Sequence, residues 1–316
     1  MNNNATAIIV LCSHLCVGDG IKPLEPNEWM KMAEKLLAVK YQPVDLLSFS
    51  TQDFSTILDL NQDQIIRIQR LIDRSASISF ELQKYQNMGI SIVTRADAEY
   101  PRKLKTTLGK TCPPIFYYVG DISLTNQDLV GFVGSRNINT QDLNFTKSTV
   151  CTINKRGYSV VSGGANGVDS VAHEESLING YFSVDFISDS LVKRLRNKSL
   201  ISAVQEKRAL ILSASNPDSG FNTGLAMMRN KFIYAQSVGT VVVKADYDKG
   251  GTWSGAVENI KNQWCPTFCW SNPEYPGNVA LIDRGAIAID KNWDGSISDH
   301  KMEKVVTTEQ LSLFDK

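Results

Sequence analysis

A glycine-rich run constrains the fold of this chain more than any other feature. The run reads SGGANGVDSVAH over residues 162–173, and it follows an apolar segment, Tyr158 to Val161. A strand, a glycine-rich turn and a helix start together form an anion site, because free backbone N–H groups and the helix dipole point at one spot. Glycines also let the backbone approach a phosphate closely. The run therefore predicts a phosphate-binding turn at the end of a buried strand.

A second turn of the same kind lies upstream. Leu129 to Val133 is typical of a buried strand, and Gly134-Ser135-Arg136 follows it at once. Two such turns on neighbouring parallel strands predict a crevice lined with phosphate-binding groups. Neither turn matches GxGxxG or GxxxxGK[ST], so the sequence supports neither dinucleotide binding nor a P-loop.

Strand-like and helix-like segments alternate from residue 90 onward, which indicates an α/β fold with a mostly parallel, Rossmann-like sheet and helices on both faces. Asp142 to Arg156, for example, has the apolar spacing of an amphipathic helix, and Gly157 ends it. The predicted strands are Ile90 to Val93, Ile115 to Val119, Leu129 to Val133, Tyr158 to Val161, Phe182 to Ile187, Ala209 to Leu212, Thr240 to Ala245 and Pro266 to Trp270.

The first 88 residues have a different character. Apolar residues recur at helical spacing, as in Trp29, Met32 and Leu36, and Met88-Gly89 resembles a glycine helix stop. We therefore expect a small helical domain over residues 1–88, an α/β domain over 89–299 and a flexible tail over 300–316.

Composition limits the kind of partner. The 316 residues carry 33 basic and 33 acidic side chains, so nucleic acid can be attracted only by a local basic patch. The six cysteines are scattered, and buried thiols in a reducing cytoplasm are a better interpretation than zinc ligation by Cys12, His14 and Cys16. Ala7 to Val17 is apolar but too short to span a bilayer. We expect a cytoplasmic protein that contacts no membrane and binds no metal or cofactor.

Four motifs in order carry a family resemblance: Gly134-Ser135-Arg136, the run at 162–173, Arg229-Asn230-Lys231 before an apolar strand, and residues 278–282 leading to Gly285-Ala286. Together they resemble the DprA/Smf family of DNA-processing proteins, which bind single-stranded DNA and load the recombinase RecA. The resemblance covers residues from about 89 to about 289. It implies a Rossmann-like domain, an N-terminal helix-hairpin (SAM-like) module and a homodimer.

The predicted DNA site combines the two turns with later segments. Arg136 is expected to grip a phosphate, the alternative being a salt bridge to a neighbouring acid. Phe221 is expected to stack on a base or to pack under a loop, and Arg229 and Lys231 either contact the backbone or form a solvated helix start. The predicted DNA-binding and phosphate-binding residues are Gly134, Ser135, Arg136, Ser162, Gly163, Gly164, Ala165, Gly167, Phe221, Arg229, Asn230, Lys231, Lys244, Gly250, Gly251 and Thr252.

Two further groups of residues have competing interpretations. Asp169 and His173 share a helix face, but a cap or loop brace and a partly buried hydrogen-bonding residue are favoured over a catalytic pair. Lys193, Arg194, Arg196 and Lys198 form the densest basic cluster, either as a solvated helix face or as an extension of a DNA track.

The chain departs from the family pattern at three places. The family tends to have an acidic residue and a Ser-Gly-Ser turn where this chain has Lys244 and Gly250-Gly251-Thr252-Trp253, which form a polar loop with Lys249 and Ser254. Asn166 stands where a basic residue is common. We also expect no C-terminal winged-helix domain. These differences favour a specialised relative.

Three classes of function follow. The leading one is a non-enzymatic protein that binds single-stranded DNA and assists recombinase loading. The second is a regulator or antitoxin that restrains a toxin or effector in a phage-defence or toxin–antitoxin pair. The third is a nucleotide-hydrolysing enzyme, because Gly250-Gly251-Thr252 followed by Glu258 is faintly similar to a loop of nucleoside-monophosphate phosphoribohydrolases.

The end of the chain suggests a separate partner. Gln310-Leu311-Ser312-Leu313-Phe314 resembles the QLxLF peptide by which bacterial proteins dock on the DNA polymerase sliding clamp. It follows a polar stretch, as expected of a tether. Leu311, Leu313 and Phe314 would then be apolar anchors with Gln310 alongside. The alternative is that they fold back onto the domain or a dimer partner.

Overall fold

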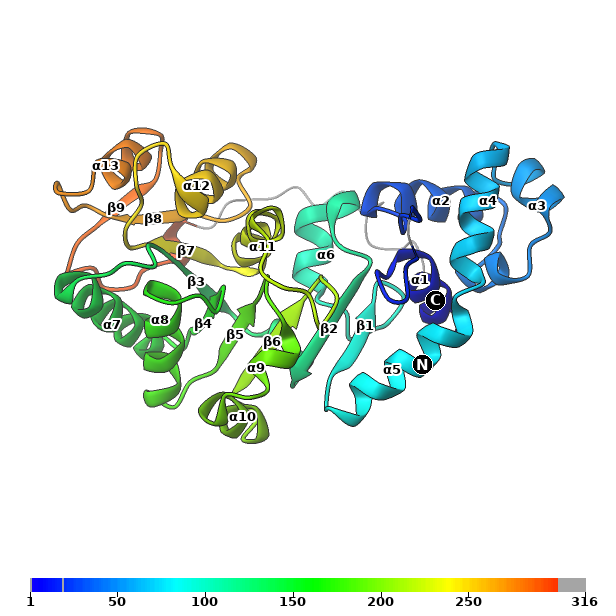
Figure 1. Cartoon of the computed structure of the whole chain (residues 1–316). Helices are drawn as coiled ribbons and strands as arrows, with labels where there is room; N and C mark the ends of the chain where they lie inside the picture. Colours follow the sequence, from blue (N-terminus) through cyan, green and yellow to red (C-terminus); the bar gives the residue numbers. More distant parts are fainter. Residues whose placement is uncertain (1, 19, 301–316) are drawn as a thin grey trace. The chain divides into compact units, whose positions relative to one another are not determined.

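The computed structural model describes residues 2–18 and 20–300 of the chain (Figure 1). These residues form two compact units, one of residues 2–118 with 214–216 and the other of residues 119–213 with 217–300. The domain boundary at 88/89 stays a prediction. No helix in the described part of the chain is long and apolar enough to cross a membrane.

The first unit is mainly helical, as expected for the N-terminal part. Arg74 is buried there, and its guanidinium donates to the carbonyl oxygens of Val10 at 2.6 Å and Leu15 at 2.7 Å, so it satisfies carbonyl groups around the end of α1. Two antiparallel strands follow the helices, with Ser91 opposite Tyr118 and Thr94 opposite Ile115. The elements are α1 (Asn3–Cys12), α2 (Pro26–Ala38), η1 (Pro43–Leu47), α3 (Thr51–Thr56), α4 (Gln62–Ile72), α5 (Ser75–Asn87), β1 (Ser91–Thr94), α6 (Arg102–Leu108), η2 (Gly109–Thr111) and β2 (Ile115–Gly120).

The second unit contains a parallel sheet, which confirms the predicted fold class. Its strands lie in the order β6-β5-β4-β3-β7-β8-β9, and each neighbouring pair is parallel. The chain progresses in opposite directions on the two sides of β3, and ligands bind at such a switch point in open α/β sheets. The strands are β3 (Leu129–Val133), β4 (Ser159–Ser162), β5 (Ser183–Phe186), β6 (Ala209–Ser213), β7 (Gly239–Val242), β8 (Thr267–Trp270) and β9 (Ile287–Ile289).

Helices cover both faces of this sheet (Figure 1). α7 and α8 share a buried core with one face, in which Phe145 stacks on Trp270 with ring centroids 4.1 Å apart. α11 and α12 pack against the other face. The helices are η3 (Ile122–Asn126), α7 (Thr140–Lys155), α8 (Val168–Ile178), α9 (Leu191–Arg194), α10 (Lys198–Gln205), α11 (Thr223–Gln236), α12 (Gly250–Asn262), α13 (Pro276–Asp283) and η4 (Ser298–His300).

Three sequence-based expectations about these elements were wrong. The apolar segment after Lys231 is not a strand but the second half of α11, where Phe232, Ile233 and Ala235 are buried. β7 ends at Val242 rather than at Ala245, and α12 already begins at Gly250, so Gly250, Gly251, Thr252 and Ser254 belong to a helix and not to the expected polar loop. β9 was missed, because its three residues are too few to show a pattern.

Asn278, from the last of the motifs, has a structural role. Its side chain is fully buried, donates to the carbonyl oxygens of Val243 at 2.9 Å and Trp270 at 2.8 Å, and accepts from the Ala245 N–H at 2.8 Å. It therefore fastens α13 to the chain just after β7 and to the end of β8.

Replacing Asn278 with alanine is expected to lower the free energy of unfolding by about 2 kcal/mol, because three buried backbone groups lose their partner. Urea denaturation measures this loss. Val279→Ala, on the neighbouring half-exposed side chain, is the control and should cost well under about 1 kcal/mol. Equal losses in the two variants would contradict the bracing role.

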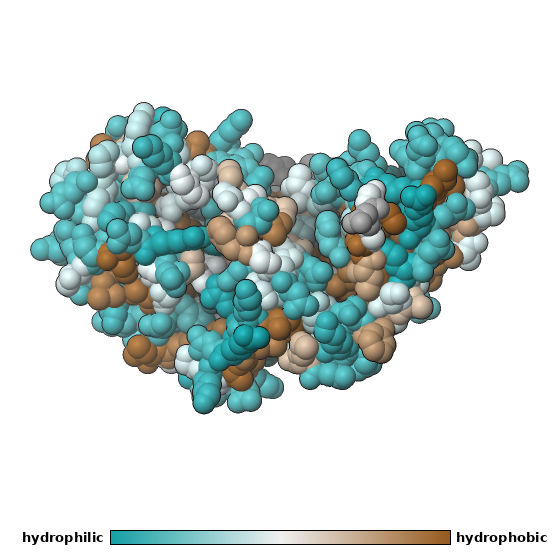
Figure 2. Space-filling view, viewed as in Figure 1, coloured by the Kyte–Doolittle hydropathy of each residue, from teal (hydrophilic) through white to brown (hydrophobic). Residues whose placement is uncertain are grey.

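Hydrophilic side chains make up most of the visible surface, and hydrophobic ones appear there in small separate groups (Figure 2). Such scattered apolar side chains are ordinary for a protein surface. Phe221 differs from the others, because the residue is 54% exposed and also lines a pocket.

Candidate functional site

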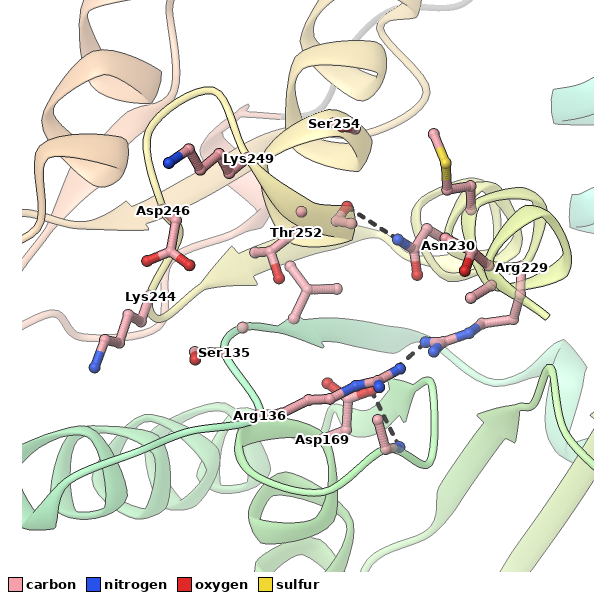
Figure 3. Close-up of a pocket in the computed structure, with 18 of the residues that line it drawn as sticks. Ser135, Arg136, Asp169, Arg229, Asn230, Lys244, Asp246, Lys249, Thr252 and Ser254 are labelled. Atoms are coloured by element: carbon pink, nitrogen blue, oxygen red, sulfur yellow. Dashed lines mark hydrogen bonds and ion pairs between the residues drawn. The ribbon is translucent and has the colours of Figure 1, made fainter. Parts of the chain in front are cut away.

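Two adjoining pockets lie where loops at the carboxyl ends of the strands meet α11 and the segment before it. Figure 3 shows the larger pocket, which the loops after β3, β4 and β7 line. The larger has a volume of about 690 Å³ and the smaller of about 260 Å³. Arg136, Ala165, Phe221 and Arg229 form a wall common to both. The crevice expected between the two glycine-containing turns is therefore present.

Arg136 lies in the loop after β3 and is exposed. Its guanidinium carbon lies 5.0 Å from the centroid of the Phe221 ring, a cation–π arrangement that orients both side chains. Among the described residues no carboxylate forms an ion pair with Arg136, which leaves its N–H donors available to an anion. The alternative interpretation, a salt bridge from Arg136 to a neighbouring acid, is therefore not seen among the described residues.

Arg229 and Asp169 form a buried pair beneath the glycine-rich loop. Arg229 Nη1 lies 3.5 Å from Asp169 Oδ2, and the two side chains are 8% and 7% exposed. Asp169 also accepts from the Ala165 N–H at 3.3 Å, so it braces the loop. Burial raises the pKa of Asp169 although Arg229 opposes the shift, and burial lowers the pKa of Arg229 although Asp169 opposes that shift.

One of the two interpretations placed Arg229 at a solvated helix start, and the structure does not agree with it. Arg229 lies in the middle of α11 and is buried, because an interior carboxylate holds it. Its Nε has no hydrogen-bond partner in the described part of the chain. In Figure 3 its guanidinium points toward Arg136 and Asp169.

Two glycines are needed for this packing, because a side chain at either position would meet a neighbour. A Cβ on Gly163 would lie 1.3 Å from Arg229 Nη1. A Cβ on Gly167, whose φ is +85°, would lie 2.3 Å from the carbonyl oxygen of Ser135. Any side chain at these positions would displace the arginine or separate the two turns.

His173 does not pair with Asp169. Its Nδ1 lies 2.7 Å from Asp185 Oδ2, and the side chains are 13% and 7% exposed. Burial alone would lower the pKa of His173, but the charge of Asp185 and its contact with the ring outweigh burial, so the pKa is raised. Neither His173 nor Asp185 lines the two pockets, so the geometry gives a catalytic Asp169–His173 pair no support.

The raised pKa predicts a pH-dependent stability. A group whose pKa is higher in the folded protein contributes its full stability below the unfolded value, about 6.5, and loses it as the pH rises through the folded value. Wild-type protein should therefore exceed His173→Gln in melting temperature by more at about pH 6 than at about pH 9. Thermal unfolding at both pH values tests this, with exposed His14→Gln as the control. A difference independent of pH would contradict the ion pair.

The far side of the larger pocket is formed by the start of α12. No side chain caps this helix, and Lys249, Gly250, Gly251, Thr252 and Ser254 line the pocket there. The free backbone N–H groups and the dipole at such a helix start favour binding of an anion. Asn230 Nδ2 donates to the carbonyl oxygen of Gly251 at 3.0 Å and so ties α11 to α12.

Lys244 lines the same pocket but is engaged elsewhere. Its Nζ lies 3.2 Å from Asp142 Oδ2 and 4.9 Å from the centroid of the Tyr275 ring. In Figure 3 its side chain points away from Arg136. Burial, then the hydrogen bond to Asp142, raises the pKa of Tyr275 to about 12. The structure therefore gives Lys244 a bracing contact with α7.

Most of the predicted site residues lie together. Those that line the larger pocket are Gly134, Ser135, Arg136, Ala165, Phe221, Arg229, Asn230, Lys244, Gly250, Gly251 and Thr252. Gly163 and Gly164 line the smaller pocket.

Three predicted residues line neither pocket. Ser162 is buried and its hydroxyl donates to the carbonyl oxygen of Phe132 at 2.7 Å, so it serves the sheet. Lys231 forms an ion pair with Glu258 at 2.9 Å, and Gly167 packs between the turns. Gln310, Leu311, Leu313 and Phe314 lie outside the described residues.

Sequence reasoning missed one face of α11. Thr223, Ala226, Met227 and Tyr234 line the larger pocket together with Asn230. Their spacing of three, four and seven residues would have placed them on one side of a helix, had the segment been recognised as helical.

The sequence matches a family model and two curated proteins over about two thirds of its length. The family model for DNA recombination-mediator protein A matches residues 91–297. DNA processing protein DprA of Bacillus subtilis (strain 168) is 26% identical over 215 residues, which are 66% of this chain and 71% of that protein. Protein Smf of Synechocystis sp. is 28% identical over 218 residues, which are 66% of this chain and 54% of that protein.

Two solved structures agree with the fold. DNA processing protein A from Streptococcus pneumoniae has a TM-score of 0.72 and 18% identity, with 96% of this chain and 99% of that chain covered. DNA processing protein A from Helicobacter pylori, described with a unique single-stranded DNA binding mode, has a TM-score of 0.53 and 26% identity, with 63% of this chain and 90% of that chain covered. Since the family model spans about two thirds of the sequence, the chain belongs to the DNA recombination-mediator protein A family of DprA and Smf proteins.

Proposed function

We propose that the chain is a non-catalytic protein that binds single-stranded DNA in the crevice between the loops after β3, β4 and β7. The observation that carries this proposal is Arg136 over Phe221, in the wall common to both pockets. A cation next to an exposed ring is suited to a phosphate and an adjacent base, and this combination holds single strands without reading their sequence.

The rest of the crevice supports the same ligand. The uncapped start of α12 and the side chain of Lys249 offer a second place for a phosphate. Buried Arg229 adds a positive charge to the shared wall, although Asp169 offsets much of it. The described single-stranded DNA binding of the Helicobacter pylori relative, at 26% identity, supports the proposal.

The proposal is tested by titrating the protein with a single-stranded oligonucleotide, a duplex of the same sequence and nucleoside monophosphates, each at two salt concentrations. Single strands should bind with micromolar affinity or better and at least about tenfold more tightly than the other ligands, and binding should weaken as salt rises. Equal affinity for duplex and single strands, or preference for a mononucleotide, would overturn it.

Other roles implied by the family resemblance extend this proposal. Recombinase loading predicts that the protein speeds assembly of a RecA-type recombinase on strands covered with single-strand-binding protein. Homodimer formation and docking on the sliding clamp through Gln310, Leu311, Leu313 and Phe314 also remain predictions, as does the regulator or antitoxin alternative.

The enzymatic alternative has less support in the geometry. Glu258, the carboxylate on which it depends, forms an ion pair with Lys231 and does not line either pocket. Release of free base from nucleoside monophosphates by the purified protein would support the enzymatic alternative.

A further inference from the structure

An exposed basic surface adjoins the smaller pocket. We use the name α9 patch for Lys193 of α9, Arg196 just after that helix and Lys198 at the start of α10. All three side chains are exposed, and none forms an ion pair with any of the described residues. Arg194, between them, is paired, with its Nη2 3.0 Å from Asp189 Oδ2. Three positive charges are therefore left uncompensated on a short stretch of chain.

The smaller pocket connects this patch to the proposed DNA site. Arg194 and Asp189 form one side of the pocket, Gly164 and Asn166 line it from the glycine-rich loop, and Arg136 with Phe221 belongs to the wall shared with the larger pocket. The loop side contributes only uncharged residues. The positive charge around this pocket therefore comes from the two arginines of the shared wall and from the α9 side.

The α9 patch is held in place rather than carried on a free loop. Leu191 is fully buried, and Ser190 Oγ accepts from the Lys193 N–H at 3.2 Å and donates to the carbonyl oxygen of Pro217 at 3.0 Å. The Val192 N–H donates to the same oxygen at 3.2 Å. The start of α9, which carries Lys193, is thus tied to the beginning of the segment that carries Phe221, and the two backbone segments are held side by side.

We propose that the smaller pocket and the α9 patch form a second, purely electrostatic part of the DNA path. This inference rests on the proposed function. A strand whose base stacks on Phe221 continues through the smaller pocket, and its next phosphates lie against Lys193, Arg196 and Lys198. A nucleic acid suits this surface better than an acidic protein does. The three cations lie near an aromatic ring, Phe221, and an arginine proposed to bind phosphate, Arg136, and only a nucleic acid would use the ring as well as the charges.

The proposal predicts a dependence on strand length. Fluorescence anisotropy with labelled oligonucleotides of about 4 and about 16 nucleotides, each at two salt concentrations, compares the crevice alone with the crevice plus the patch. The triple variant Lys193→Gln/Arg196→Gln/Lys198→Gln should bind the long strand at least about tenfold more weakly and lose roughly 2 from its salt slope, since each phosphate contact contributes about 0.7. Its affinity for the short strand should stay within about twofold of the wild-type value.

A matched control separates this site from net charge. Lys155→Gln/Lys207→Gln/Lys261→Gln removes the same charge from exposed side chains that line neither pocket, and it should leave both affinities close to wild type. Equal effects of the two triple variants, or equal wild-type affinity for short and long strands, would overturn the extension while leaving the crevice intact. Failure of the wild-type protein to bind either strand would instead refute the proposed function itself.

Discussion

Asp169→Asn is expected to lower the free energy of unfolding by about 3–5 kcal/mol. Asp169 and Arg229 are both buried, so removal of the carboxylate leaves the guanidinium without a counter-charge in the interior, and breaking one partner of a buried pair is costly. The one amide oxygen that remains can still accept from the Ala165 N–H, so the expected loss comes from the missing charge and not from a missing acceptor. Urea denaturation followed by tryptophan fluorescence measures the loss.

Two companion variants test the reason for that loss. Glu258→Gln breaks the more exposed pair with Lys231 and should cost at most about 1 kcal/mol. Adding Arg229→Gln to Asp169→Asn should restore part of the stability, because the buried charge is then removed. Additive losses in the double variant would show that the pair is not what holds the loop.

The double variant Arg136→Ala/Phe221→Ala is expected to weaken binding of single-stranded DNA about a hundredfold or more. A charged hydrogen bond to a phosphate contributes about 1.5–3 kcal/mol, and a stacked base about 1–3 kcal/mol. The melting temperature should change little, because both side chains are exposed. Titration by fluorescence anisotropy measures the affinity.

The chain offers a matched control for this pair. Arg284 lies over the Trp253 ring at 4.9 Å from its centroid, in a comparable cation–π arrangement outside both pockets. Arg284→Ala removes the same charge and the same kind of contact, and it should leave DNA affinity within about twofold of wild type. A loss as large as that of the double variant would remove Arg136 and Phe221 from the site.

The sequence predicted those parts of the molecule that depend on local pattern. Short buried strands of four or five residues, each followed by a glycine turn, were recognised at β3 and β4, and the parallel sheet followed from their alternation with helices. The helical run of α11 was divided wrongly, because Arg229-Asn230-Lys231 interrupts its apolar residues. Only the structure shows that Arg229 is buried against Asp169, a residue sixty positions earlier.

Residue types alone do not show which polar groups are already engaged by other parts of the protein. Ser162 is the last residue of β4 and Lys244 lies just after β7, where phosphate-binding residues are often found, but the Phe132 carbonyl oxygen and the Asp142 carboxylate already engage them. Arg136 looks no different in sequence, yet it forms no ion pair with a carboxylate in the described ranges. Such pairing is set by tertiary contacts between segments far apart in the chain, which a single sequence does not display.

Locating the bound strand on the protein tests most directly whether single-stranded DNA lies in the crevice beside Phe221. A short oligonucleotide that carries 5-iododeoxyuridine is irradiated in complex with the wild-type protein, and the products are analysed by mass spectrometry. It should cross-link to Phe221, because a base is proposed to stack on that ring. The cross-link should disappear in Phe221→Leu, where the aromatic ring is lost. Cross-links confined to residues 2–118, with none in the loops after β3, β4 and β7 or in the segment of Phe221, would contradict the account.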